Sequence, residues 1–103
     1  AKQATGKDPA YIAALHELPC CICKAFGFMQ TSPTTAHHCI CGRTPNRKSP
    51  DRMAIPLCDE HHQGNWSKNS DKLAIHQGKA SWVAAYGKDT DYIAATQDAV
   101  AML

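Results

Sequence analysis

Apolar residues near the start of the chain repeat at the spacing of an α-helix. Because 3.6 residues make one turn, they would share one face of that helix. The residues of this face are Tyr11, Ile12, Leu15 and Leu18. Asp8 followed by Pro9 is typical of a helix start, with an acidic cap and a proline in the first turn, and Pro19 should end the helix. Residues 1–7 are small and polar, and we expect them to be flexible.

The middle of the chain alternates short apolar stretches with turn-forming residues. This pattern predicts a cysteine turn at 18–23, a strand at 36–41, a loop at 42–51, a second strand at 53–57 and a short helix at 59–63. Gly64 should stop that helix. A hairpin of two strands is only marginally stable in water, so some other interaction must hold it.

Helical patterns account for the remainder of the chain. They predict helices at 70–77, 79–86 and about 90–102, with Gly78 and Gly87 at the ends of the first two. We therefore expect an α+β protein with a flexible segment at 1–7 and a single domain at 8–103. Within that domain, a core at about 18–66 would be followed by a helical tail at 70–102.

The size of the chain favours an additional staple. A domain of 103 residues buries a small core, and domains of this size often depend on a metal or on disulfides. No apolar stretch has the ~20 residues that span a bilayer, and no secretion signal is visible at the N-terminus. We therefore expect a cytoplasmic protein with reduced thiols, which favours metal binding by its six cysteines over disulfide pairing.

The net charge of +2 is small but unevenly distributed. Only Asp51 offsets a basic stretch that contains Arg43, Arg47, Lys48 and Arg52. A basic loop of this kind suits contact with phosphate groups. The alternative is a solvated surface loop.

Two cysteine and histidine pairs have the spacing of a tetrahedral metal site. They are Cys20-x-x-Cys23 and Cys58-x-x-His61, and a set of three cysteines and one histidine is typical of structural zinc. Binding would join two segments far apart in the chain, so that metal affinity becomes folding free energy. Cys21 could replace Cys20 at a less favourable spacing, and buried free cysteines are the alternative without metal.

Three further histidines could form a second, open site. His37 and His38 would point to opposite faces of a strand, and His62 would point about 100° away from its neighbour on a helix. Adjacent histidines therefore need not serve the same centre. Cys39 and Cys41 would share a face with His37, where a strand interior is the preferred interpretation and a metal pair the alternative.

The order of these motifs resembles the HNH endonucleases of the ββα-metal type. Closest are the phage recombination-enhancement nucleases that act with RecA, on the segments LPCCIC at 18–23, HHCICGRT at 37–44 and PLCDEHHQ at 56–63. The resemblance covers about residues 10–66. It implies a small zinc-stapled, treble-clef-like ββα-metal core with flanking helices.

The resemblance also implies roles for individual residues. His37 and His62 would bind a catalytic divalent cation such as Mg²⁺, Mn²⁺ or Zn²⁺, and His38 would be the general base. Contacts to DNA would come from the basic residues Arg43, Arg47, Lys48 and Arg52. The partners would be DNA and a RecA filament in a bacterial host cell.

Two positions depart from the HNH pattern. Met53 stands where these enzymes usually carry an asparagine, and Asp51 is the nearest polar substitute that could orient His38, with Asn46 as the other candidate. A third ligand on the helix is also missing. His76 could fill that place, and a core or surface histidine is the alternative.

These observations predict a metal-dependent DNA endonuclease that hydrolyses phosphodiester bonds. The alternative is a non-catalytic zinc adaptor that docks on nucleic acid or protein. His38 distinguishes the two, because the enzyme needs it unligated and facing solvent, whereas an adaptor with two structural sites needs it as a ligand or not at all.

Overall fold

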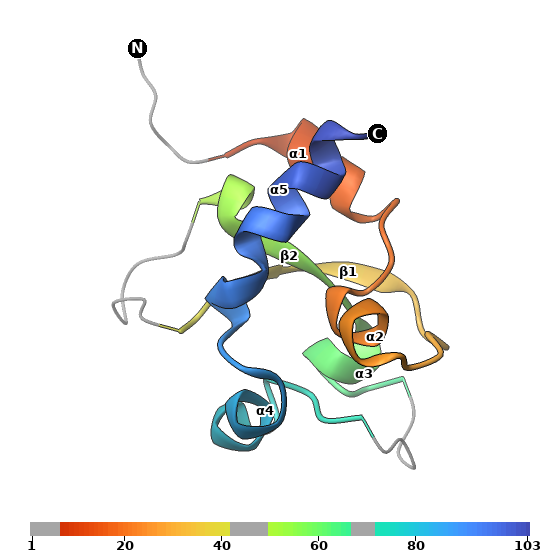
Figure 1. Cartoon of the computed structure of the whole chain (residues 1–103), viewed down its shortest axis with the longest axis vertical. Helices are drawn as coiled ribbons and strands as arrows, with labels where there is room; N and C mark the ends of the chain where they lie inside the picture. Colours follow the sequence, from red (N-terminus) through yellow and green to blue (C-terminus); the bar gives the residue numbers. More distant parts are fainter. Residues whose placement is uncertain (1–6, 42–49, 67–71) are drawn as a thin grey trace.

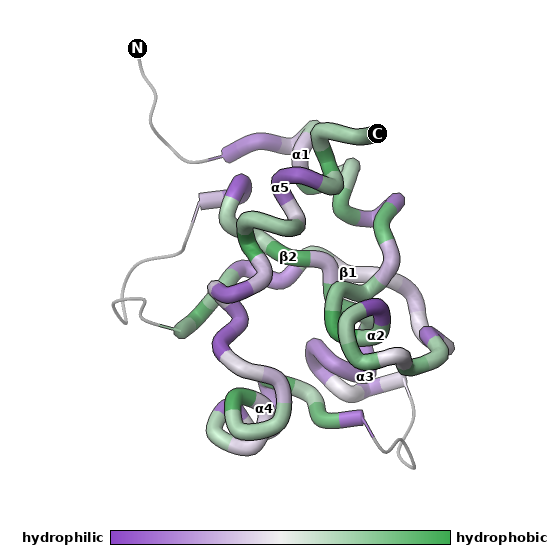
Figure 2. The backbone as a smooth tube through the Cα atoms, in the orientation of Figure 1, coloured by the Kyte–Doolittle hydropathy of each residue, from purple (hydrophilic) through white to green (hydrophobic). Residues whose placement is uncertain are grey.

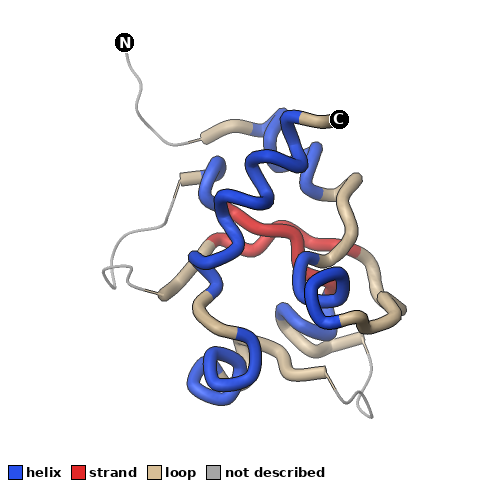
Figure 3. The backbone as a smooth tube through the Cα atoms, viewed as in Figure 1, coloured by secondary structure: helices blue, strands red, loops and turns tan. Residues whose placement is uncertain are grey.

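The computed structural model describes residues 7–41, 50–66 and 72–103 as a small mixed α/β fold. Its elements in chain order are α1 (Pro9–Leu15), α2 (Cys21–Phe26), β1 (Thr34–His38), the 3₁₀ turn η1 (Asp51–Met53), β2 (Ala54–Cys58), α3 (Asp59–His62), α4 (Lys79–Tyr86), the 3₁₀ turn η2 (Asp89–Tyr92) and α5 (Ile93–Ala101). In this view the two strands lie in the middle, with α1 and α5 toward the top and α3 and α4 toward the bottom (Figures 1 and 3).

The sheet consists of β1 paired antiparallel with β2. His37 lies opposite Ile55 and His38 lies opposite Ala54. All five residues of β2 are buried, which agrees with its largely hydrophobic composition (Figure 2). A proline is tolerated in β2 because, among the described residues, β2 has no second neighbouring strand that would need its N–H.

The first strand is shifted from its predicted position. We expected residues 36–41, and the strand begins at Thr34 and ends at His38. It ends early because the backbone amides of Ile40 and Cys41 donate to the carboxylate of Asp89, at 2.7 and 3.2 Å, instead of to a neighbouring strand. Cys39 and Cys41 therefore lie beyond the strand, and both are buried.

The helices around the first cysteine pair differ in length from the prediction. α1 begins with the Asp8 cap, as expected, and ends at Leu15 instead of continuing to Leu18. The expected cysteine turn is a helix, α2, which the Cys20 thiol caps by accepting from the Cys23 amide at 3.5 Å. Gly27, at φ 75°, ends it in the left-handed conformation that glycine favours.

The helix predicted at 70–77 is wrong for its described part, residues 72–77. The amides of Ile75 and His76 donate to the carbonyls of His61 and His62, both at 3.0 Å. These two bonds join the segment to the end of α3, and the segment does not form a helix of its own. The helix predicted at 79–86 is confirmed as α4, and the last predicted helix is divided into η2 and α5.

Buried side chains form two clusters. The larger one includes Cys20, Ile22, Cys23, Cys39, Ile55, Leu57, Cys58, Ile75, Trp82 and Tyr86, and the smaller one includes Tyr11, Leu15 and Ala54. Trp82 is fully buried, and its indole N–H donates to the His61 carbonyl at 3.1 Å. Within the described ranges, none of the helices has the length and apolar character needed to cross a bilayer.

Candidate active site and metal centres

The first site lies where two short helices begin. Cys20 and Cys23 come from the start of α2, whereas Cys58 ends β2 and His61 lies in α3. The four side chains are buried, and their ligand atoms lie within 4.8 Å of one another. The four residues predicted from their spacing are thus brought together and could hold a metal ion.

The distances within this group fit tetrahedral zinc. The Cys23 and Cys58 sulfurs are 3.8 Å apart, and the Nδ1 of His61 lies 3.3–3.6 Å from the three sulfurs. A tetrahedron with zinc bonds of about 2.3 Å to sulfur and about 2.0–2.1 Å to nitrogen places two sulfurs about 3.8 Å apart and a sulfur about 3.5 Å from the nitrogen. The group therefore already has the dimensions of a zinc site.

One of the three thiols, Cys58, favours the metal-binding form, whereas burial raises the pKa of Cys23. A hydrogen bond between the buried Cys20 and Cys58 thiols raises the pKa of Cys20 and lowers the pKa of Cys58, so that one thiolate is stabilised. The thiolate is the form that binds metal. Burial also raises the pKa of the Cys21 thiol, to about 12, and Cys21 does not belong to the group.

The second site is formed by three histidines from three segments. His37 lies in β1, His62 in α3 and His76 in the segment 72–77, and their ligand nitrogens lie within 4.8 Å of one another. The ring centroids are 4.8–5.4 Å apart. His37 and His62 are buried, whereas His76 is exposed. A cation held here would therefore be open to solvent on one side.

Hydrogen bonds hold two of these rings with one nitrogen left for a ligand. His37 Nε2 bonds the Asp89 carboxylate at 2.9 Å, and its buried Nδ1 has no partner among the described atoms. His62 Nδ1 lies 2.7 Å from the Thr35 hydroxyl, which donates to the Leu57 carbonyl. Thr35 must therefore accept from His62 Nδ1–H, so that His62 Nε2 keeps its lone pair. Such partners orient metal-binding histidines in proteins.

The charge states of these partners suit a cation site. Burial, and then the neighbouring imidazoles, lower the pKa of His62 to about 4, so this ring is neutral at neutral pH. Burial alone would raise the pKa of Asp89, but hydrogen bonds from His37 and from backbone amides outweigh it and leave the pKa below its ordinary value. A carboxylate thus faces one nitrogen of His37, as it does in many metal sites.

His38 is not part of this group and pairs with Asp51 instead. Its Nε2 lies 2.8 Å from Asp51 Oδ1, and about a fifth of each side chain is exposed. Alternation along β1 explains why His37 and His38 serve different partners. The predicted pairing of His38 with Asp51 is observed, and the other candidate, Asn46, lies outside the described residues.

The predicted basic stretch is described only in part. Arg43, Arg47 and Lys48 lie outside the described residues. Arg52 is 69% exposed, and its Nε donates to the Asp8 carboxylate at 2.9 Å. Its guanidinium also lies 5.4 Å from the centre of the Tyr11 ring.

Two residues of the site escaped the sequence analysis. Thr35 precedes His37 by two positions, so strand alternation could have placed them on one face. Asp89 lies 52 positions after His37, and no local pattern connects them.

Comparison with known proteins gives a family that covers most of the chain. The family model described as "Recombination enhancement, RecA-dependent nuclease" matches residues 4–101. No curated protein and no solved structure matches the chain. The match extends from before α1 through the last residue of α5 and includes every candidate site residue.

Proposed function

The chain belongs to the family of recombination-enhancement, RecA-dependent nucleases, and from this premise we propose that it is a metal-dependent DNA endonuclease of the HNH type. The fold would be a ββα-metal core formed by β1, β2 and α3. The proposal goes beyond the family description in the type of active site, the metal dependence and the residues that act.

One observation carries this proposal. The ligand nitrogens of His37, His62 and His76 converge, while His38, the next residue in β1, is oriented by a carboxylate instead of joining them. A site that only needed structural metal would gain nothing from a solvent-accessible histidine and aspartate pair beside it. The arrangement therefore supports an enzyme over the alternative, a non-catalytic zinc adaptor.

We assign the catalytic cation to His37, His62 and His76. A divalent cation such as Mg²⁺, Mn²⁺ or Zn²⁺ would stabilise negative charge on the phosphate and on the departing 3′ oxygen. Asp89 and Thr35 bond one nitrogen each of His37 and His62, so that the other nitrogen of each ring can face the cation. Three protein ligands leave coordination positions for substrate and water.

His38 would act as the general base. With Nε2–H donated to Asp51, the lone pair of Nδ1 can accept a proton from water. The water oxygen then bonds to phosphorus as the bond from phosphorus to the 3′ oxygen breaks. His38 keeps the water's proton, and the 3′ oxygen is protonated from solvent. Neutral imidazole is well suited to this step near neutral pH.

The zinc at Cys20, Cys23, Cys58 and His61 would have a structural role. It would join the start of α2 to the end of β2 and to α3, which carries His62. A fully coordinated zinc ion would thus hold the cation site in shape and supply folding free energy.

Contacts to DNA would come from Arg43, Arg47, Lys48 and Arg52. They would hold backbone phosphates, which position a protein on DNA without reading its sequence. So few basic residues favour targeting by a partner. We propose that a RecA filament supplies this targeting in the cytoplasm of a bacterial host, and that the protein is encoded by a phage or prophage.

The test is plasmid cleavage with Mg²⁺ or Mn²⁺, with and without RecA filaments. A general base contributes about 10²–10⁴-fold, so His38→Ala should lose at least about 100-fold in rate while it keeps its fold and its metal content. The matched control is His16→Ala, because His16 is exposed and belongs to neither metal group. Absence of cleavage by the wild type under all these conditions, or equal rates for the two variants, would contradict the proposal.

A further inference from the structure

The residue that caps α1 reaches the catalytic pair. The backbone N–H of Asp8 donates to Asp51 Oδ2 at 2.7 Å, while Asp51 Oδ1 bonds His38 Nε2 at 2.8 Å. Both oxygens of the Asp51 carboxylate are therefore engaged by partners from different parts of the chain. A carboxylate that is held at both oxygens cannot rotate away from its histidine without breaking a hydrogen bond.

Asp8 is itself held in place by its side chain. One carboxylate oxygen accepts from the Tyr11 amide at 3.2 Å, which caps the helix, and the other accepts from Arg52 Nε at 2.9 Å. Arg52 directly follows Asp51 in η1. Two consecutive residues of η1 thus bond Asp8. Asp51 accepts from its backbone N–H, and Arg52 donates to its side-chain carboxylate.

Packing behind these bonds keeps α1 against η1. Tyr11 and Leu15 are buried in one cluster with Ala54, the residue that follows η1. From α5, Gln97 donates to the carbonyl of Arg52 at 2.9 Å. Figure 1 shows α1 and α5 on the side of the sheet where η1 lies. Both ends of the described chain therefore meet at the turn that carries Asp51.

We propose that Asp8 is a positioning residue for the His38–Asp51 pair. The backbone amide of Asp8 fixes the orientation of the Asp51 carboxylate. The side chain of Asp8 accepts a hydrogen bond from Arg52, which keeps that amide in place. Asp51 then holds the proton of neutral His38 on Nε2 and leaves Nδ1 available to the attacking water. This inference rests on the proposed function, because it assigns α1 the task of completing the nuclease site.

The first test compares cleavage kinetics at saturating DNA. Loss of a residue that orients a metal ligand typically lowers metal affinity or activity 10–100-fold, and by analogy we expect Asp8→Ala to lower kcat about 10-fold, with KM nearly unchanged. Asp8→Asn keeps one side-chain oxygen for the cap but loses the bond to Arg52, so its kcat should lie between those of Asp8→Ala and the wild type. Ala13→Gly is the matched control, because it weakens α1 by a similar amount at an exposed position away from Asp51.

The second test reads the His38 ring directly. Long-range ¹H–¹⁵N NMR of ¹⁵N-histidine protein, assigned with His38→Gln, reports which ring nitrogen is protonated. We expect the Nε2–H form in the wild type and in Ala13→Gly, and a larger Nδ1–H fraction in Asp8→Ala, with Asp8→Asn between them. Should Asp8→Ala not fold, Asp8→Gly replaces it, because glycine is well tolerated at a helix cap.

The two tests separate this inference from the proposed function. The NMR result needs no cleavage, so a tautomer shift in a protein that does not cut DNA would support the positioning role and contradict the nuclease proposal. Conversely, an active wild type whose Asp8→Ala variant matches Ala13→Gly in kcat and in tautomer would overturn the positioning role alone.

Discussion

Asp89 should be among the most sensitive single positions in this chain, and Asp89→Asn tests the reasoning. Asp89 is fully buried. Its carboxylate accepts from His37 Nε2 at 2.9 Å, from the Ile40 amide at 2.7 Å and from the Cys41 amide at 3.2 Å. Both oxygens are used, so the amide group of asparagine must direct its NH₂ toward at least one donor.

The expected loss follows from this geometry. A hydrogen bond to a charged group contributes about 1.5–3 kcal/mol, and a buried donor left without a partner costs about 1–3 kcal/mol. Asp89→Asn leaves at least one donor unpaired and removes the charge from the other bonds. We therefore expect the free energy of unfolding to fall by about 3–4 kcal/mol, out of about 5–15 kcal/mol for a typical domain.

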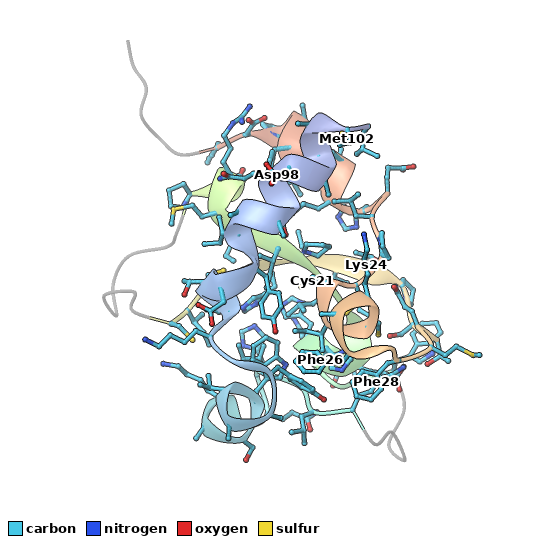
Figure 4. All side chains as sticks on the ribbon, viewed as in Figure 1. Cys21, Lys24, Phe26, Phe28, Asp98 and Met102 are labelled. Carbon is cyan, nitrogen blue, oxygen red and sulfur yellow. The ribbon has the colours of Figure 1, made fainter. Side chains whose placement is uncertain are left out.

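Thermal and urea unfolding of the zinc-loaded protein would measure this loss. Each kcal/mol lowers the Tm of a domain of this size by about 4–8 °C, so Tm should fall by at least ~12 °C. Asp98→Asn is the control with the same charge change, because Asp98 is exposed on α5 (Figure 4). If Asp89→Asn unfolded within about 4 °C of Asp98→Asn, the assignment of Asp89 as the anchor of His37 and of the end of β1 would be refuted.

Two further predictions concern the zinc site and the end of α3. Cys58→Ser should bind one zinc ion fewer per chain by elemental analysis and lose cooperative unfolding. Cys21→Ser should keep its zinc content and its cooperative unfolding. Equal losses of zinc and cooperativity in the two variants would contradict the ligand set. Gly64→Ala should destabilise the protein more than Gly27→Ala in urea unfolding. Both glycines have positive φ, so backbone strain is common to the two variants. An added Cβ at Gly64 would lie 2.4–2.9 Å from neighbouring side chains, whereas nothing lies within 4 Å at Gly27. An equal or smaller loss of stability for Gly64→Ala would show that the crowding there is relieved.

The cysteine-rich metal-ligand group was predictable because its signals are local, whereas the histidine group was expected only from the family resemblance. Cys20 and Cys23 lie one helical turn apart, as do Cys58 and His61, and such pairs must face one point if they bind metal. Alternation on a strand likewise separates His37 from His38. The pairing of His38 with Asp51 was predicted from the absence of an asparagine at Met53, and the structure contains that contact.

The parts that escaped prediction depend on contacts across the fold. Apolar periodicity favoured a helix at 70–77, but the amides of Ile75 and His76 bond the carbonyls at the end of α3. β1 ends at His38 because Asp89, from the far end of the chain, takes the next amides. Local sequence patterns do not indicate which groups a buried carboxylate will bond. The sequence predicted Asp8 as a helix cap, but nothing in the sequence indicated the bond between Asp8 and Asp51.

The most direct test of the account is the number and ligands of the bound metal ions. Crystals of the metal-loaded protein, measured by anomalous scattering at the metal edge, would locate each ion and the atoms bonded to it. We predict one ion about 2.3 Å from the sulfurs of Cys20, Cys23 and Cys58 and about 2.0–2.1 Å from His61 Nδ1. A second ion should bind His37, His62 and His76, with His38 bonded to Asp51 and to neither metal. A single ion, or a second ion that includes His38 among its ligands, would contradict the account.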